Sequence, residues 1–359
     1  MDDYIISGIQ QIGIGVEDFK EAWKYYINTF NMDVKILEDD TVAELMLPYT
    51  GKKPQKRHAA IAINMQGGSG FEIWQYSERK PLKIDFEIQF GDLGICVAKI
   101  KSRNVKQTYH EFLNKPGVKI LGGLNKYIDG TDTFYMEDPF ANVFQIVHDK
   151  SIFREEHRSS GGPVGGIVGV TDINRSLPLY QDILGYDKVI ADVTGNFEDI
   201  AGLNSGNGKF RRVLLTHSEP RLGNFSRLFG QSTIELVQAL DRKPRKIYEG
   251  RYWGDPGFIQ ICFDVKNMNA LKEKCESMGF NFTVDSSAKG EFDMGEASGH
   301  FTYIEDADGT LIEFVETYKI PLVKKLGINL NLRSFNPQKP ISDWMLKALR
   351  FGRVKAESL

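Results

Sequence analysis

The sequence predicts an α+β protein with four βαβββ modules, which form two curved mixed-sheet half-barrels, and a C-terminal tail with a short helix. Three observations predict this fold. A segment that reads as strand, turn and helix recurs along the chain, and each copy ends in a short apolar strand with one polar residue inside it. The chain has 359 residues, which is too long for one ordinary hydrophobic core.

The first and third copies of the repeated segment are the clearest. Residues 11–32 read as an alternating strand, an acidic turn and a helix whose apolar side chains recur every three or four positions. Residues 165–186 repeat this order, and Asp172 stands where the helix needs an N-terminal cap. Weaker copies begin at Asp92 and Phe258. The chain therefore carries the same structural unit four times.

Each copy is closed by a short apolar strand, at residues 70–76, 142–149, 232–240 and 310–317. Two of these strands follow the sequences MEDPFAN and EDADG, whose Asp, Pro, Asn and Gly residues favour tight hairpin turns. Strand, helix and about three further strands make a βαβββ module. The four modules cover approximately residues 5–80, 86–150, 160–240 and 255–318.

The modules predict an N-terminal domain at residues 1–155, a C-terminal domain at 156–320 and a tail at 321–359. A charged segment rich in Gly, Ser and Pro, at residues 154–163, reads as the linker between the halves. An alternative pairing joins module one with four and module two with three. In the tail, a basic amphipathic helix is expected to pack Trp344 and Leu349 on the protein's own surface; docking on a second subunit, as a homodimer, is the alternative.

Composition excludes several classes of partner. With 45 Lys and Arg residues against 48 Asp and Glu, the net charge is −3, so no basic excess exists to bind nucleic acid. No apolar stretch approaches the roughly 18 residues that a membrane helix needs, and the N-terminus lacks the pattern of a signal peptide. The three cysteines are scattered and have no metal-type spacing. We expect a soluble, cytoplasmic protein that acts on a small molecule.

Alternation along the strands separates a concave face from a core face. In the first strand Ile12 and Ile14 face the core, which leaves Gln11 on the concave side. In the strand at 70–76, Glu72 shares the concave side with Trp74. Polar side chains on this face are candidates for a functional site.

The repeated module resembles that of the vicinal oxygen chelate superfamily, which includes glyoxalase I, bleomycin-resistance proteins, methylmalonyl-CoA epimerase and extradiol dioxygenases. The resemblance covers roughly residues 5–318. It is closest to glyoxalase I, in which a Gln, alternating apolar residues and an acidic turn also open the first strand. It implies that paired modules surround a metal ion, with ligands from the first and last strand of each module.

Carried onto this sequence, the resemblance implies four metal ligands: Gln11, Glu72, Asp92 and Gln145. Family members usually have His where Asp92 stands, and glyoxalase I has Glu where Gln145 stands. Two carboxylates and two amides suit a hard cation such as Mg, Mn or Ca. The resemblance implies a divalent metal cofactor: Mn, Mg, Zn, Ni or Fe. A polar cluster that needs no metal is the alternative interpretation.

The second half does not carry a complete ligand set. Its matching positions are Gly165, Glu235, Phe258 and Glu313, and neither Gly nor Phe can coordinate a metal. Glu235, Gln260 and Glu313 are expected to line a degenerate pocket. Ring-cleaving dioxygenases hold Fe(II) on two His and one carboxylate in this half. Only Glu313 remains of those three positions, so the dioxygenase reaction is not expected.

Glu72 is the predicted catalytic base, because Trp74 and Tyr76 beside it are expected to raise its pKa. These two rings and Tyr135 are the predicted substrate-binding residues. The resulting hypothesis is a metal-dependent, glyoxalase-like lyase or isomerase that removes a proton next to a metal-bound carbonyl. The alternative is a non-catalytic protein of the bleomycin-resistance type that sequesters a planar ligand.

Overall fold

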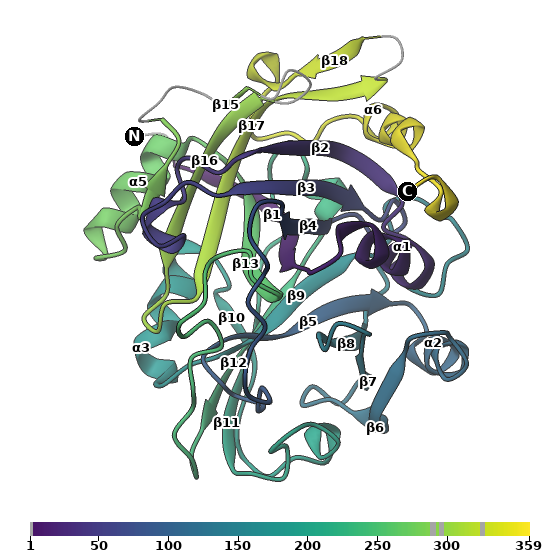
Figure 1. The fold of residues 1–359 in the computed structure, drawn as a ribbon, viewed down its shortest axis with the longest axis vertical. Coiled ribbons are helices and arrows are strands. Elements are labelled where there is room, and N and C mark those ends of the chain that lie inside the picture. Colours follow the sequence, from purple (N-terminus) through teal and green to yellow (C-terminus); the bar gives the residue numbers. More distant parts are fainter. Residues whose placement is uncertain (1–2, 288–291, 294–297, 324–326) are drawn as a thin grey trace.

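The structure is a computed structural model that describes residues 3–287, 292–293, 298–323 and 327–359. Two large curved sheets dominate it, one above the other in Figure 1. Sheet A has the strand order β14-β16-β17-β13-β1-β4-β3-β2, with β15 and β18 attached at β16 and β17. Sheet B has the order β10-β11-β12-β9-β5-β8-β7-β6. The predicted α+β fold of two half-barrels is confirmed.

The elements follow the predicted modules. The first module consists of β1 (Ile5–Gly15), α1 (Phe19–Phe30), β2 (Val34–Val42), β3 (Lys56–Ile63) and β4 (Gly70–Tyr76). The second consists of β5 (Gly94–Ser102), α2 (Val105–Phe112), β6 (Lys119–Lys126), β7 (Asp132–Glu137) and β8 (Val143–His148). The third consists of β9 (Pro163–Gly169), α3 (Ile173–Pro178), β10 (Lys188–Gly195), β11 (Phe210–Thr216), α4 (Ser226–Phe229) and β12 (Thr233–Ala239). The fourth consists of β13 (Gly257–Lys266), α5 (Met268–Ser277), β14 (Val284–Asp285), β15 (Phe292–Asp293), β16 (Ser298–Glu305) and β17 (Leu311–Val323). The tail contains β18 (Ile328–Asn331), α6 (Asp343–Lys347) and a 3-10 segment at Ala348–Gly352.

The modules pair across the two halves of the chain. Strand β1 of module one pairs antiparallel with β13 of module four, and β5 of module two pairs with β9 of module three. This is the alternative pairing that the sequence left open. Residues 1–155 and 156–320 therefore each contribute strands to both sheets.

Helix α1 shows why the repeated segment folds as expected. The Asp18 side chain accepts a hydrogen bond from the Glu21 backbone N–H at 2.9 Å and so caps the helix. The helix ends at Asn31, which has the left-handed conformation (φ 55°) that such a stop requires. Its apolar stripe, including Trp23 and Phe30, is fully buried.

The largest hydrophobic cluster draws residues from all four modules and joins the two sheets. Phe144 of β8 lies at its centre and is fully buried. Its ring contacts Phe30 and Phe71 of module one at centroid distances of 4.8 and 5.9 Å. It also meets Phe258 of module four edge-on at 5.3 Å. Both sheets therefore share one core.

The tail packs on sheet A, but not through both of the predicted residues. Leu349 is buried in a second cluster with Leu346 and Ile341, as the amphipathic pattern predicts. Trp344 is 69% exposed, so the prediction that it packs on the protein's own surface is wrong. The helix is short, and Trp344 lies on the face that points away from the cluster. Among the described residues, no helix is both long and apolar enough to cross a membrane.

Replacing Phe144 with Ala tests whether the sheets share a core. Removing this buried ring should lower the free energy of unfolding by about 3–5 kcal/mol, because it leaves a cavity between modules. Urea unfolding should still show one transition. Phe351→Ala removes a ring that is 62% exposed and should change stability by about 0.5 kcal/mol or less. Two separate transitions in the Phe144 variant would contradict a shared core.

Candidate functional site

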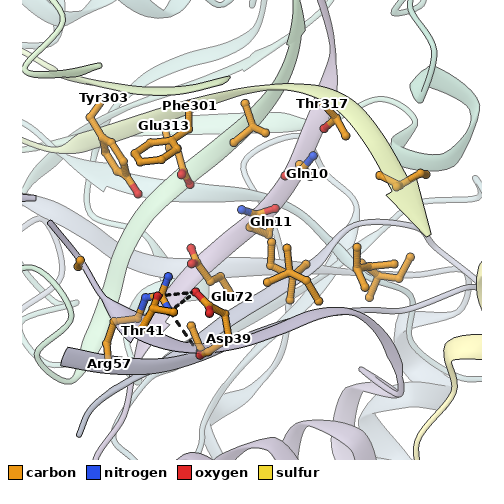
Figure 2. A pocket seen from close by; sticks show the side chains of 18 of the residues that line it. Gln10, Gln11, Asp39, Thr41, Arg57, Glu72, Phe301, Tyr303, Glu313 and Thr317 are labelled. Atoms are coloured by element: carbon orange, nitrogen blue, oxygen red, sulfur yellow. Dashed lines mark hydrogen bonds and ion pairs between the residues drawn. The ribbon is translucent and has the colours of Figure 1, made fainter. Parts of the chain in front are cut away.

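The concave face of sheet A holds a cavity of about 540 Å³. Strands β1, β2, β3, β4, β16 and β17 contribute side chains to its wall, together with α4 and the tail. Figure 2 shows that Gln11, Glu72 and Glu313 lie around its polar centre. These three residues come from modules one and four, which the sheet pairing brings together.

A β-bulge in β1 aims two consecutive glutamines at the cavity. The register between β1 and β13 shifts between Ile9 and Gln11, so Gln10 faces the same side as Gln11. The Oε1 atom of Gln11 is buried and, among the described residues, has no hydrogen-bond partner. A buried amide oxygen without a donor is costly unless something else binds it.

Gln260 joins the two carboxylates across a glycine. Its Nε2 donates to Glu72 Oε2 at 2.8 Å and lies 3.4 Å from Glu313 Oε2. Strand β1 runs between the strands of Gln260 and Glu72, and Gly13 is the residue beneath the amide. A Cβ at Gly13 would lie 2.6 Å from the Gln260 amide atoms, so only glycine lets this side chain cross β1.

Gln260, not Phe258, is the counterpart of Gln11 in module four. In β1 and β4, Gln11 pairs with Gly70, two residues before Glu72; in β13 and β17, Gln260 pairs with Leu311, two residues before Glu313. The expected position at Phe258 is therefore wrong by two residues. Phe258 belongs to the hydrophobic core. The equivalent set in sheet A is Gln11, Glu72, Gln260 and Glu313.

The indole of Trp253 determines the orientation of the Gln260 amide. Trp253 Nε1 donates to Gln260 Oε1 at 3.1 Å, which turns the amide nitrogen toward the two carboxylates. The opposite orientation would set two N–H groups against each other. Gln260 therefore acts as a hydrogen-bond donor at this site in the present arrangement.

The two carboxyl groups have raised pKa values. Burial is the main cause of the raised pKa of Glu72, and the positive charge of Arg57 and the hydrogen bond from Gln260 oppose it. Burial and then repulsion from Glu72 raise the pKa of Glu313 to about 8. Two carboxylates that share one buried site do not ionise together easily. The pair therefore tends to keep one proton near neutral pH.

An ion pair lies beside this centre on the same cavity wall. Arg57 Nη1 lies 2.5 Å from Asp39 Oδ2, and the Thr41 hydroxyl donates to the same carboxylate at 2.7 Å (Figure 2). Asp39 thus neutralises Arg57, although Arg57 still opposes the rise in the pKa of Glu72.

Trp74 and Tyr76 support the site from below and do not line the cavity. Both are fully buried, and the Trp74 ring meets that of Trp253 at a centroid distance of 4.5 Å. The Tyr76 hydroxyl donates to the Trp253 backbone carbonyl. These rings therefore hold Trp253, and with it Gln260, rather than a ligand. The expectation that they bind substrate directly is wrong, because Trp253 covers them.

Asp92 and Gln145 lie in sheet B, away from Gln11 and Glu72. Asp92 precedes β5, and its carboxylate accepts hydrogen bonds from Arg242 Nη1 at 2.7 Å and from the Arg245 backbone N–H at 3.0 Å. It anchors a loop. The expectation of one ion bound by all four residues is therefore wrong, because modules one and two do not pair.

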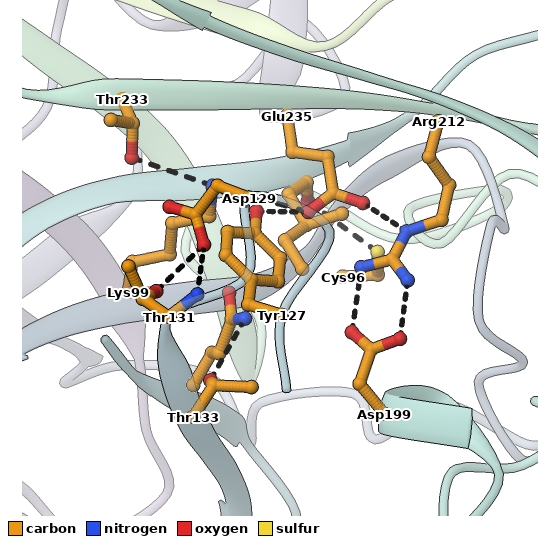
Figure 3. A network of polar contacts seen from close by, with 12 residues as sticks. Cys96, Lys99, Tyr127, Asp129, Thr131, Thr133, Asp199, Arg212, Thr233 and Glu235 are labelled. Carbon is orange, nitrogen blue, oxygen red and sulfur yellow. Dashed lines mark hydrogen bonds and ion pairs between the residues drawn. The ribbon is translucent and has the colours of Figure 1, made fainter. Parts of the chain in front are cut away.

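In sheet B, the site around Glu235 corresponds to the polar centre of sheet A and is filled by basic side chains (Figure 3). Arg212 Nε donates to Glu235 Oε1 at 2.6 Å, and its other nitrogens bind Asp199 at 2.7 and 3.0 Å. Lys99 Nζ lies 4.0 Å from Glu235 and donates to the Tyr127 hydroxyl at 2.9 Å. Arg212, Glu235 and Lys99 are fully buried. Although burial opposes it, these two cations lower the pKa of Glu235.

Gln145 and Tyr135 belong to this filled place. Gln145 Nε2 donates to the Thr133 hydroxyl at 3.1 Å, and Tyr135 is fully buried beside the network. Among the described residues, Gln145 Oε1 and the Tyr135 hydroxyl have no hydrogen-bond partner. Burial raises the pKa of Tyr135 well above its usual value. Glu235 and Glu313, expected together in one pocket, lie in different sheets. Tyr135 therefore does not reach the cavity of sheet A.

The side chains of sheet A fit a divalent cation better than those of sheet B. Two carboxylates and the amide oxygen of Gln11 are the kind of ligands that hard cations prefer. Within the described residues, no group of three or more His, Cys, Asp and Glu is placed to hold a metal ion. An ion here would therefore depend on amide oxygens as well as on the two carboxylates.

Comparison with known proteins supports this view of the fold. Residues 166–298 match the family model of the Glyoxalase/Bleomycin resistance protein/Dioxygenase superfamily. The structure is similar to glyoxalase I from Zea mays, with a TM-score of 0.50 at 15% identity over 86% of this chain and 92% of that chain. It is also similar to a putative dioxygenase from Bacillus subtilis, with a TM-score of 0.55 at 13% identity over 87% and 86% of the chains. No curated protein matches the sequence. The chain has the vicinal oxygen chelate fold, as its sequence predicts.

Several site residues were missed by sequence reasoning. Gln10 has the wrong parity for the concave face, and only the bulge turns it inward. Arg57, Asp39, Trp253 and Tyr303 have no motif that distinguishes them. The dipeptide Gln10–Gln11 at the start of a strand was the one available signal for a bulge beside the site.

The pH dependence of stability should report the raised pKa of Glu313. A carboxyl whose pKa is higher in the folded state favours folding at low pH, and this advantage is lost as pH rises from about 4.5 to about 8. Its loss should contribute at most about 1.4 kcal/mol per pH unit. Glu313→Gln should therefore gain stability relative to the wild type between pH 5 and 8, as measured by urea unfolding. As a control, Glu273→Gln changes an exposed carboxyl, and its stability should depend on pH as that of the wild type does. If the stability of Glu313→Gln also changes with pH in parallel with the wild type, the raised pKa of Glu313 is contradicted.

Arg212→Met tests the network of sheet B. It leaves Glu235 and Asp199 buried without their main cation, so we expect a loss of about 3–5 kcal/mol in the free energy of unfolding. The neighbouring Arg211 makes an exposed pair with Asp192, and Arg211→Met should cost about 1 kcal/mol or less. Equal losses in the two variants, measured by chemical unfolding, would show that the buried network is not a main support of the fold.

Proposed function

We propose that this protein is a metal-dependent lyase or isomerase of the glyoxalase type, which acts on a small carbonyl compound in the cavity of sheet A. The observation that carries the proposal is the polar centre: two facing carboxyl groups with raised pKa values beside the buried oxygen of Gln11, which has no partner in the part of the chain that the structure describes. Such groups are typical of sites that bind cations or move protons.

Gln11 Oε1 and the carboxylates of Glu72 and Glu313 are the proposed ligands. A bound divalent cation supplies stabilisation of the negative charge that develops on a substrate oxygen. Gln260 keeps its donor toward the two carboxylates, because Trp253 fixes its amide. It would therefore hold the ligands in place by hydrogen bonds rather than coordinate the ion.

The carboxyl pair is also the proposed proton carrier. Glu72 was predicted as the base, and it faces Arg57 and Gln260, which favour its ionised form. Glu313 has a pKa of about 8 and shares its surroundings with Tyr303, with which it is hydrogen-bonded. A carboxyl with a pKa near the working pH can both accept and return a proton. We propose that the ionised Glu72 takes the substrate proton and that Glu313, which holds the proton of the pair, returns one to the product.

A non-catalytic binding protein of the bleomycin-resistance type is the second candidate. One observation favours it: the Gln260 amide already bridges the two carboxyl groups at 2.8 and 3.4 Å, which partly satisfies them without an ion. In this alternative the cavity binds its ligand equally well with and without divalent cations.

Metal content separates the candidates. Protein purified without chelator or affinity metal should retain close to one divalent ion per chain by elemental analysis. The double variant Glu72→Gln, Glu313→Gln should lose it, because both charged ligands are removed. The control variant Gln145→Leu changes the position of β8 in sheet B that corresponds to Glu72 of β4, and it should retain the ion.

Proton abstraction is then read by NMR as deuterium incorporation from D2O into 2-hydroxycarbonyl compounds, which the double variant should abolish. A wild type that binds no ion even after Mn²⁺, Mg²⁺, Zn²⁺, Ni²⁺ or Fe²⁺ is added would overturn the metal-dependent enzyme. It would leave the binding protein as the better account.

A further inference from the structure

We propose that the ligand of this cavity is an uncharged carbonyl compound with an extended apolar group, which lies in an apolar arm beside the polar centre. The position of the carbonyl group rests on the proposed function, whereas the position of the apolar group does not. The apolar arm is defined by side chains that line one part of the cavity and belong to one packed cluster: Ile36, Ile63, Phe225, Leu228, Phe229 and Leu349.

The arm is a built part of the fold and not a gap at its edge. Five of its side chains are at most 5% exposed, although they line the cavity: Ile63, Phe225, Leu228, Phe229 and Leu349. Figure 2 shows carbon-only side chains gathered on the side of Gln11 that lies away from Arg57. The cavity therefore has a polar centre and an apolar extension.

Segments far apart in the sequence close the arm. Helix α4 of module three lies directly on sheet A, where a Cβ at Gly8 would be 2.9 Å from the Cβ of Phe229 and one at Gly68 would be 1.7 Å from the Leu228 carbonyl. Asn224 then ties the tail to this helix, since its Nδ2 donates to the backbone carbonyls of residues 336 and 339 at 3.0 and 2.9 Å. A helix of module three and the tail, which lies outside the four modules, therefore form this wall together.

The charges of the lining disfavour an anionic group at the far end of the ligand. The charged residues on the wall are four acids and one base: Asp39, Glu44, Glu72, Glu313 and Arg57. Arg57 is the one cation among the described lining residues, and Asp39 binds it at 2.5 Å. A ligand whose far end carries a carboxylate would lose hydration in the apolar arm without gaining a protein cation in return.

Size and polarity together define the class of ligand. A cavity of about 540 Å³ falls in the range that holds a ligand of roughly drug size. The carbonyl end fits the Gln11, Glu72 and Glu313 centre, and the aliphatic or aryl chain fits the arm. Each methylene that enters the arm should raise affinity about threefold.

Displacement of N-phenyl-1-naphthylamine, an uncharged fluorescent probe, tests this inference without any turnover. Straight-chain alkane-2,3-diones of increasing length should displace the probe with affinities that rise about threefold per carbon until the arm is full. A dione of matched length that ends in a carboxylate should bind at least tenfold more weakly. Affinities that do not depend on chain length, or equal binding of the carboxylate, would overturn the proposal.

Substitutions at two edge strands locate the binding site. Ile36 lies on β2, the edge of sheet A, and Ile36→Asp should weaken binding of the longest dione at least tenfold. Ile190→Asp makes the same change on β10, the edge of sheet B, where the side chain is 40% exposed, and should leave binding unchanged. Ile36→Trp keeps the arm apolar but fills it, so affinity should stop rising at a shorter chain. Equal effects at the two edges would contradict the assignment.

The same titrations separate this inference from the proposed function. With the Glu72→Gln, Glu313→Gln variant, the chain-length series should persist even though proton exchange is lost. If the series persists and the wild type neither binds an ion nor exchanges protons, the apolar arm stands and the enzyme fails. If exchange occurs with short diones and chain length has no effect, the enzyme stands and the apolar arm fails.

Discussion

The antiparallel pairing of β1 with β13 is the constraint on which the rest of the structure depends. It joins the first module to the fourth, and so places Glu72 and Glu313 on one concave face although 241 residues separate them (313 − 72). It also places the Gln260 side chain over Gly13, where any residue other than glycine would collide with the amide through its Cβ. The polar centre, the raised pKa values of its carboxyl groups and the cavity above it all follow from this one strand pair.

The two sheets show how one geometry supports opposite outcomes. At the matching place of sheet B, Glu235 is satisfied by Arg212 and Lys99, which occupy the space where an ion or ligand would lie. In sheet A the Gln260 amide bridges the two carboxyl groups, Tyr303 is hydrogen-bonded to Glu313, and a cavity remains open beside them. Repetition of the module therefore produced one filled site that supports the fold and one open site that is available for chemistry.

Much of the fold was predictable from the sequence, but the site was predictable only in part. Hydrophobic alternation placed Gln11 and Glu72 on the concave face, and that prediction is confirmed by their position in the cavity wall. The partner module was not predictable, because strand pairing over a long sequence separation leaves no local signal. Register caused the error at Phe258, since a shift of two residues preserves the alternation. Asp92 has the right chemistry for a ligand but precedes its strand.

Anomalous diffraction from crystals soaked in Mn²⁺ tests the central claim most directly. The account predicts one strong peak in the cavity of sheet A, within coordination distance of Gln11 Oε1 and the carboxylates of Glu72 and Glu313, and none beside Glu235. A peak in sheet B, or a sheet A cavity that stays free of manganese while Gln260 still bridges the two carboxyl groups, would contradict it.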